Sequence, residues 1–253
     1  MAAKTNPLLN SLTFVGEITL ILADCGKRMF RRPFEARETI EQMAFVGVSS
    51  VPIVALTNFF SGAVLALYST QFLTRYGGGT FVGATVALAA AREMGPVLAG
   101  IMVAARCGSA MAAQIGSMAV TEQVDALRML SVHPTSFLVV PRVLASITML
   151  PVLALVGIYS AVFGGWLVAG LGGVPSSVFV QSMQQFMEPW DFVGGVLKAP
   201  IFGLIISLVA CQQGLRTKEG AVGVGKATTH TVVISMVLIY VANYFLAAVL
   251  FAK

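Results

Sequence analysis

Charged residues are scarce in this chain. Only 11% of its 253 residues are Asp, Glu, Lys or Arg, whereas 57% are apolar. Soluble domains average about 25% charged and about 45–50% apolar residues, so this balance excludes an ordinary water-soluble domain. The net charge is +5, but so few charges cannot form the dense basic face that duplex nucleic acid requires. We therefore expect no nucleic-acid partner.

Cysteine and histidine are also rare. The three cysteines, Cys25, Cys107 and Cys211, lie far apart in the sequence, and the chain has only two histidines. No C-x-x-C pair or Cys-His cluster has the spacing of a disulfide framework or a zinc site. We expect no metal site, and we interpret the cysteines as small apolar packing residues.

Long apolar runs are what the chain has instead. Five of them reach the length of about 20 residues that a helix needs to cross a bilayer, and they lie at about 44–68, 80–106, 143–171, 192–214 and 228–251. The segment 174–190 is predicted to be a loop with some amphipathic character. Residues 107–120 either extend the second span into the cytoplasm or form a break after it.

Basic residues in the connections predict the orientation. Arg128 and Arg142 flank one connection and Arg216, Lys218 and Lys226 fill another, whereas 172–190 contains neither Lys nor Arg. The positive-inside rule then places the N-terminus in the cytoplasm and, after five spans, the C-terminus outside. A sixth span would put the last basic connection on the wrong side.

The N-terminal region, residues 1–43, precedes the first span. From about residue 8 to residue 30, apolar residues recur at helical spacing, and a basic cluster follows them. This pattern predicts an amphipathic helix lying in the membrane interface. The alternative is a solvated cytoplasmic helix that packs on the rest of the chain.

Three charged residues interrupt the spans. Arg92 and Glu93 lie in the second span, and Lys198 lies in the fourth. Each charge costs roughly 2.5–3.5 kcal/mol at mid-bilayer, so these residues must pair or line a wet cavity. Lys198 is the expected partner of Glu93. The functional interpretation is a polar substrate site, and the alternative is an ion pair that only fixes helix register.

An apolar face lies at the outer end of the first span. Leu65, Phe72, Leu73 and Tyr76 occur at i, i+7, i+8 and i+11, which is one helical face. Such a face outside a charged cluster favours an amphiphilic substrate. Ordinary helix packing is the alternative.

A short polar helix is predicted at about 121–132. Thr121 is its expected N-cap, Glu122 and Asp125 are acids of its first turn, and it ends before His133-Pro134. Such a helix either covers the membrane face of the protein or docks into a separate ATPase.

A near-match to a nucleotide motif is rejected. Gly220, Gly225 and Lys226 form G-x-x-x-x-G-K, but Ala227 follows where a Ser or Thr would hold magnesium, and no strand precedes the glycines. ATP, if it is used, must be bound by a partner.

Several segments together resemble the MlaE permease family, the membrane subunit of lipid-transporting ABC systems. The resemblance extends over nearly the whole chain from about residue 40. The segments that show it are Ala91-Arg-Glu-Met-Gly-Pro96, Arg106-Cys-Gly-Ser-Ala110, Ala119-Val-Thr-Glu-Gln123, Pro141-Arg142 and Gly223-Val-Gly-Lys-Ala-Thr-Thr229. Two positions depart from the family pattern: Gln114 replaces its usual acid, and His133 stands where an Asp often precedes the proline.

The resemblance implies an all-α integral membrane protein with an interfacial N-terminal helix, five transmembrane helices and a short cytoplasmic coupling helix. It implies a homodimer in the bacterial inner membrane, bound to two cytoplasmic ATPase subunits and to a periplasmic MCE-type lipid-binding oligomer. ATP and magnesium would belong to the ATPase, and this chain would need no cofactor. The phospholipid pathway would involve Arg92, Glu93 and Lys198, and ATPase coupling would involve Thr121, Glu122, Gln123, Asp125 and Arg128.

Two other classes of function remain as alternatives. An ion- or proton-coupled carrier of a small amphiphile could use Glu93 and Lys198 as a relay, although no internal repeat supports it. An intramembrane enzyme is less favoured, because the charged set includes no nucleophile, metal pair or catalytic histidine.

Overall fold

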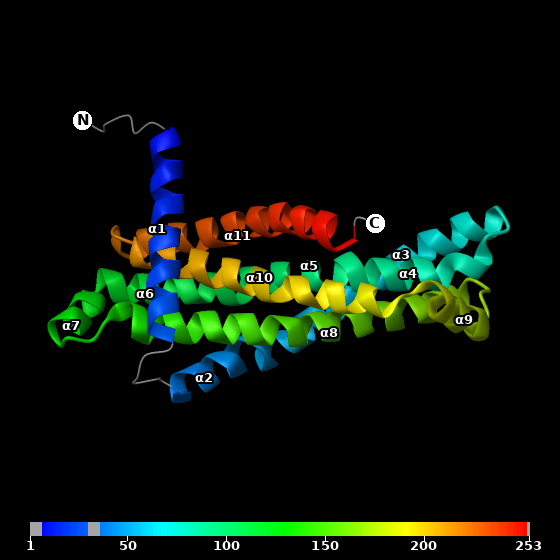
Figure 1. Cartoon of the computed structure of the whole chain (residues 1–253), viewed down its shortest axis with the longest axis horizontal. Helices are drawn as coiled ribbons and strands as arrows, with labels where there is room; N and C mark the ends of the chain where they lie inside the picture. Colours follow the sequence, from blue (N-terminus) through cyan, green and yellow to red (C-terminus); the bar gives the residue numbers. More distant parts are fainter. Residues whose placement is uncertain (1–6, 30–35, 252–253) are drawn as a thin grey trace.

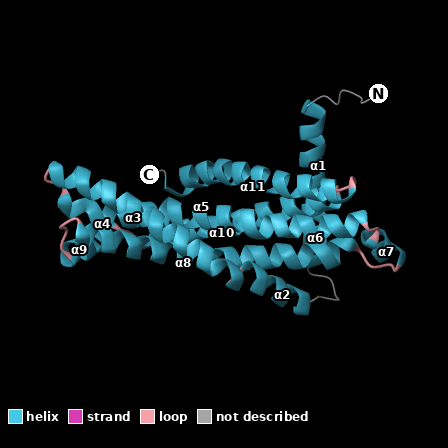
Figure 2. Cartoon of the chain, turned by 180° about the vertical axis from the view of Figure 1, so that it is seen from behind, coloured by secondary structure: helices cyan, strands magenta, loops and turns pink. Residues whose placement is uncertain are grey.

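The computed structural model describes residues 7–29 and 36–251, and every regular element within these ranges is a helix (Figure 2). Five helical rods are long and apolar enough to cross a membrane: Ala36–Arg75, Gly79–Val120, Thr135–Leu171, Pro189–Leu215 and Gly220–Phe251. The predicted all-α fold with five spans is therefore confirmed. Residues 1–6 and 30–35 of the predicted N-terminal region lie outside the described residues.

The rods are longer than the apolar runs that predicted them. The first comprises α2 (Ala36–Val46) and α3 (Val51–Arg75) with a short 3₁₀ turn between them. The second comprises α4 (Val82–Ala89), α5 (Gly95–Val103) and α6 (Ser109–Val120). The other three are α8 (Val140–Leu171), α10 (Pro189–Leu215) and α11 (Gly220–Phe251).

The second rod continues through residues 107–120 without a break. Two π-helical turns, Ala90–Met94 and Ala104–Gly108, join its three α-helices. Its 42 residues correspond to about 60 Å of helix, twice the hydrocarbon thickness. Of the two alternatives for residues 107–120, the structure shows the extension of the second helix, and the rod must project beyond the hydrocarbon core.

The predicted loop at 174–190 is also wrong, because it contains the helix α9 (Ser176–Phe186). Phe179 and Ser182 are its buried residues, and the Ser182 hydroxyl accepts a hydrogen bond from the Ala84 amide at 3.1 Å. Gly83 permits this approach, since a Cβ there would overlap the carbonyl oxygen of Phe179. The amphipathic character of the segment thus belongs to a helix that packs on α4.

Helix α8 is the centre of the bundle and packs against α2, α3, α5 and α10. Its contact with α3 depends on small residues: a Cβ on Gly62 would overlap the carbonyl oxygen of Ala161, and one on Gly164 would overlap that of Phe59. Small residues let helix backbones approach closely where no hydrophobic effect drives association.

Helix α11 is buried on one side only. Its buried residues recur every four positions, and they are Gly223, Ala227, Thr231, Ser235 and Ile239. The opposite side exposes apolar residues that include Val233, Val237, Val241, Tyr244 and Phe245. This large apolar face has no covering element among the described residues.

Helix α1 (Pro7–Met29) runs across the bundle near the end that carries α6 and α7 (Figure 1). Ile18, Ile21 and Cys25 pack against residues of α8 and α10. Leu12 and Leu20 are 70% and 72% exposed. An apolar face directed away from the bundle, on a helix that crosses it, is the geometry expected of an interfacial helix.

A buried cation on α8 has no acidic partner among the described residues. Arg142 is 5% exposed, and its Nη1 donates to the Leu138 carbonyl oxygen at 2.7 Å. Its Nη2 meets only the Gln114 amide oxygen at 3.4 Å, and its Nε has no partner. Gln114 is the position where the resemblance led us to expect an acid.

Gln114→Glu should therefore stabilise the protein. A carboxylate at this exposed position would meet the Arg142 guanidinium at little desolvation cost, and a hydrogen bond to a charged group contributes about 1.5–3 kcal/mol. We expect a higher midpoint of thermal unfolding in detergent for this variant, with Gln185→Glu on exposed α9 as the control. An unchanged or lower midpoint would contradict the pairing.

Candidate functional site

The π-helical turn Ala90–Met94 presents Arg92 and Glu93. Such turns insert one extra residue into a helix and frequently occur at functional sites. Gly195 on α10 lies directly against this turn, since a Cβ there would overlap the Ala91 carbonyl oxygen. The missing side chain lets α10 approach closely, so that Lys198, about one turn further along, reaches the same level.

Lys198 is fully buried, and its ammonium group is completely satisfied. Its Nζ donates to Glu93 Oε1 at 2.9 Å, to the Arg92 carbonyl oxygen at 2.8 Å and to Asn243 Oδ1 at 3.1 Å. These three acceptors match the three hydrogens of an ammonium group. The expected pairing of Glu93 with Lys198 is therefore confirmed by geometry.

Asn243 of α11 closes the network. Its Nδ2 donates to Glu93 Oε2 at 2.6 Å while its oxygen accepts from Lys198. Glu93 keeps 43% of its side chain exposed, whereas Lys198 has 0%. The Glu93 carboxylate on the second rod thus contacts both α10 and α11, and part of it remains exposed at the surface of the bundle.

Arg92 points to a different partner. Its Nε and Nη2 both contact Asp191 Oδ1, at 2.8 Å and 2.6 Å. Asp191 lies in the first turn of α10, where its Oδ2 also accepts from the Glu188 amide at 2.8 Å in a capping box. The carboxylate is 3% exposed and the Arg92 side chain 40%, so the guanidinium extends from a buried anchor toward accessible space.

One aromatic ring lies close to both cations. The Phe251 ring centroid lies 5.0 Å from Arg92 Cζ and 5.0 Å from Lys198 Nζ. A cavity of about 250 Å³ opens here, lined by Arg92, Phe186, Glu188, Trp190, Asp191, Leu250 and Phe251. A cation that faces a cavity beside aromatic rings can hold an anionic group.

An apolar cavity of about 410 Å³ adjoins it, and Glu188 lines both. Its other lining residues are mostly apolar: Ile158, Tyr159, Val162, Met183, Met187, Pro189 and Phe192 accompany Gln184. The end of α9 and the start of α10 therefore lie between a cationic pocket and an apolar one, which is an arrangement that suits an amphiphile.

The four apolar residues that the spacing placed on one face of α3 differ in their packing. Leu65 and Leu73 pack against the core shared by α3, α4, α8 and α9. Phe72 and Tyr76 are 64% and 72% exposed, with ring centroids 5.0 Å apart. The four positions fall within about 100° around an ideal helix, so they can share one face, but only the two leucines pack against the core. The role of these residues in a lipid pathway stays a prediction.

The predicted coupling helix is shorter than expected. It is α7 (Gln123–Met129), at the opposite end of the bundle from α9 (Figure 1). Thr121 is not its N-cap, because the Thr121 hydroxyl donates to the Ser117 carbonyl oxygen at 2.9 Å. The cap position is Glu122, whose φ of 59° gives it a left-handed backbone. A tight turn between α6 and α7 requires this conformation, which the sequence did not indicate.

The coupling candidates nevertheless lie together on the surface. Thr121, Glu122, Gln123, Asp125 and Arg128 are all exposed. Arg128 Nη1 and Asp125 Oδ1 form an ion pair at 2.9 Å. Met129 and Leu130, 87% and 73% exposed, lie beside them. A polar surface with exposed apolar residues is typical of a protein-docking site.

Sequence reasoning missed Asp191 and two uncharged neighbours of the charged residues, Asn243 and Phe251. Asp191 is an acid at the start of a span, next to Pro189, and these helix-start signals could have identified it. Asn243 is a polar amide inside the last apolar run and could have been found as such, whereas nothing marks Phe251. Across the described residues, no group of three or more His, Cys, Asp or Glu side chains could hold a metal ion.

Five membrane-spanning helices with a charged cluster between them define a multi-pass membrane protein of the transporter type. The family model described as Permease MlaE matches residues 39–249. The chain therefore belongs to the MlaE permease family, and it is an ABC transporter permease.

Several relatives support this assignment. A probable ABC transporter permease protein of Rickettsia bellii is 43% identical over 96% of this chain and 99% of its own length. One of Synechocystis is 40% identical over 85% of this chain and 82% of its own length. The chloroplastic protein TRIGALACTOSYLDIACYLGLYCEROL 1 of Arabidopsis thaliana is 36% identical over 92% of this chain and 67% of its own length.

Glu93→Gln should destabilise the protein by about 3 kcal/mol, because it leaves the buried Lys198 ammonium without a counter-ion. Adding Lys198→Met removes the unpaired charge and should restore much of the loss. We expect a double-mutant cycle, measured by thermal unfolding in detergent, to give a coupling energy of more than about 1 kcal/mol. The exposed pair Asp125–Arg128 is the control, and equal coupling in both pairs would contradict the burial argument.

Proposed function

We propose that this permease moves phospholipids between the inner membrane and a periplasmic MCE-type lipid-binding oligomer, driven by ATP hydrolysis in two separate cytoplasmic subunits. The observation that carries the proposal is the cationic pocket at Arg92 beside the apolar pocket at Tyr159 and Phe192. The phosphate of a phospholipid would pair with the guanidinium, and an acyl chain would occupy the apolar side.

A relative supports a lipid substrate. The Arabidopsis protein carries the name of trigalactosyldiacylglycerol, a lipid with two acyl chains. Its identity of 36% extends over nearly all of this chain. A diacyl substrate fits an apolar pocket better than a small hydrophilic solute does.

A second copy of the chain would complete the transporter. The uncovered apolar side of α11, with Val233, Val237 and Val241, offers a surface for it. The partly exposed Glu93 carboxylate contacts Asn243 of the same helix. A homodimer formed on this side would enclose the charged cluster between its two copies.

The proposed orientation follows from the distribution of charge. The connection between α10 and α11 carries Arg216 and Lys218 and lies at the same end as α7 (Figure 1). We assign this end to the cytoplasm, with a cytoplasmic N-terminus and a periplasmic C-terminus.

The ATPase subunits would dock on α7 and would bind ATP and magnesium, so that this chain needs no cofactor and no catalytic site. The MCE-type partner would meet the end that carries α9.

An ion-coupled carrier is not favoured. All three hydrogens of Lys198 are engaged by acceptors, whereas a relay residue must exchange its proton with water. Membership of an ABC permease family points to ATP as the energy source.

The double variant Arg92→Gln, Asp191→Asn tests the lipid pocket without leaving an unpaired charge. We expect ATP-dependent transfer of fluorescent phospholipid in reconstituted vesicles to fall about tenfold, the equivalent of one charge-assisted hydrogen bond. Arg75→Gln, an exposed cation outside the pocket, is the control. Full transfer by the double variant would refute a role for the guanidinium.

Glu122→Ala tests the coupling surface. We expect the ATPase subunits to keep hydrolysing ATP while lipid transfer per ATP falls several-fold, because an altered turn before α7 would no longer transmit their movement. Co-purification of the ATPase and the thermal unfolding midpoint are measured alongside. If the variant transfers lipid with wild-type stoichiometry, α7 does not couple through this residue.

A further inference from the structure

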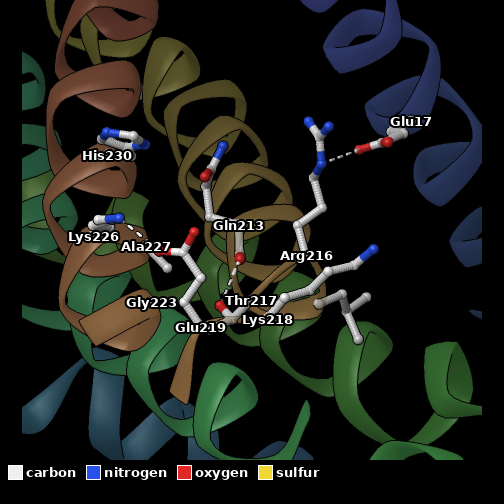
Figure 3. Close-up of a pocket in the computed structure, with 11 residues that line it drawn as sticks. Glu17, Gln213, Arg216, Thr217, Lys218, Glu219, Gly223, Lys226, Ala227 and His230 are labelled. Atoms are coloured by element: carbon white, nitrogen blue, oxygen red, sulfur yellow. Dashed lines mark hydrogen bonds and ion pairs between the residues drawn. The ribbon is translucent and has the colours of Figure 1, made fainter. Parts of the chain in front are cut away.

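A second polar cavity lies at the opposite end of the bundle from Arg92. It has a volume of about 650 Å³ and lies between the end of α10, the start of α11 and helix α1 (Figure 3). The lining includes three cationic side chains, Arg216, Lys218 and Lys226, the imidazole of His230, and two acidic side chains, Glu17 and Glu219. The proposed transport function assigns no role to this cavity.

The basic groups are not equally neutralised. Lys226 Nζ and Glu219 Oε2 are 2.6 Å apart. The hydrogen bond and the charge of Lys226 lower the pKa of the exposed Glu219 carboxyl. This pair is therefore satisfied within the protein. It leaves Arg216 and Lys218 as the cations that an external anion would meet.

Arg216 is only weakly paired. Its Nε lies 3.6 Å from Glu17 Oε2, and the same oxygen already accepts a 2.7 Å hydrogen bond from Gln212 Nε2. Figure 3 shows the terminal nitrogens of the guanidinium directed away from Glu17. These donors are free to bind two oxygens of one phosphate group.

Lys218 makes no ion pair with any residue that the structure describes. Its side chain is exposed and extends toward α1 on the same side as Arg216 (Figure 3). Helix α11 begins two residues later at Gly220 and directs the positive end of its dipole toward this connection. Two cations and a helix N-terminus therefore face the same cavity.

The level of the cavity relative to the membrane indicates which anion would reach it. Helix α1 forms one wall through Glu17, and its exposed Leu12, Val15 and Leu20 give it the character of an interfacial helix. A cavity beside such a helix lies at the level of the lipid headgroups. Basic pockets between helices at the cytoplasmic surface bind anionic headgroups.

We propose that this cavity binds the phosphate of an anionic phospholipid headgroup, held by Arg216 and Lys218 under the cover of α1. The bound lipid would be a resident of the membrane and not the transported molecule, since the cavity is separated from Arg92 by the length of the bundle. Binding would connect α1 to the start of α11 through the lipid.

The test uses the full chain in mild detergent, without ATP and without the ATPase. Native mass spectrometry measures the ratio of phosphatidylglycerol to phosphatidylcholine retained after incubation with equal amounts of both. We expect phosphatidylglycerol to be enriched in the wild type. The enrichment should fall about fivefold in Lys218→Gln and further in the Arg216→Gln, Lys218→Gln double variant.

Two control variants locate the effect. Arg37→Gln removes an exposed cation of α2 outside the cavity, and Arg92→Gln with Asp191→Asn removes the charges of the transport pocket. Both should retain the wild-type enrichment. Equal enrichment in the wild type and the Arg216, Lys218 double variant would overturn the proposal, as would loss of enrichment in the transport-pocket variant alone.

A third arm separates a lipid from a free anion. Inorganic phosphate, added against chloride of equal ionic strength, should leave the retained phosphatidylglycerol unchanged; its displacement would overturn the lipid assignment in favour of a soluble phosphate. Because the measurement needs neither ATP nor transport, the headgroup site and the proposed function can fail independently.

Discussion

The buried ammonium group of Lys198 is the constraint around which the membrane part of this protein is arranged. A lysine with no exposed surface must have three acceptors, and these come from the π-helical turn of the second rod and from α11. The glycine at position 195 permits the necessary approach of α10. Loss of any one acceptor would leave one hydrogen of a buried ammonium group without a hydrogen bond, which costs free energy.

The two ion pairs of this region, Glu93–Lys198 and Arg92–Asp191, share one feature. Glu93 is anchored by Lys198 and Asn243 yet stays partly exposed, and Arg92 is anchored by buried Asp191 yet faces a cavity. Each charged pair therefore has one buried member and one accessible member. In the proposed function, a substrate headgroup would exchange with the accessible members while the buried ones keep the helices in register.

The two ends of the bundle carry different chemistry. At the end with α9, a cationic pocket adjoins an apolar one. At the end with α7, an exposed polar helix, helix α1 and a basic cavity lie near the connections between spans. This division agrees with the proposed function, in which the ATPase docks at one end and the lipid binds at the other.

The sequence by itself determined the all-helical membrane class, the number of spans and the pairing of Glu93 with Lys198, because apolar run length and the cost of a buried charge are local properties that can be read along the chain. Tertiary structure alone decided that Arg92 pairs with Asp191, that Asn243 completes the network, and that residues 107–120 continue one long rod. Those outcomes depend on which helices lie side by side and on the π-helical turns that rotate their faces, and neither is encoded in the spacing of apolar residues. The scarcity of charge predicted that the few charges within the spans would matter, but only the packed helices showed which partners they have.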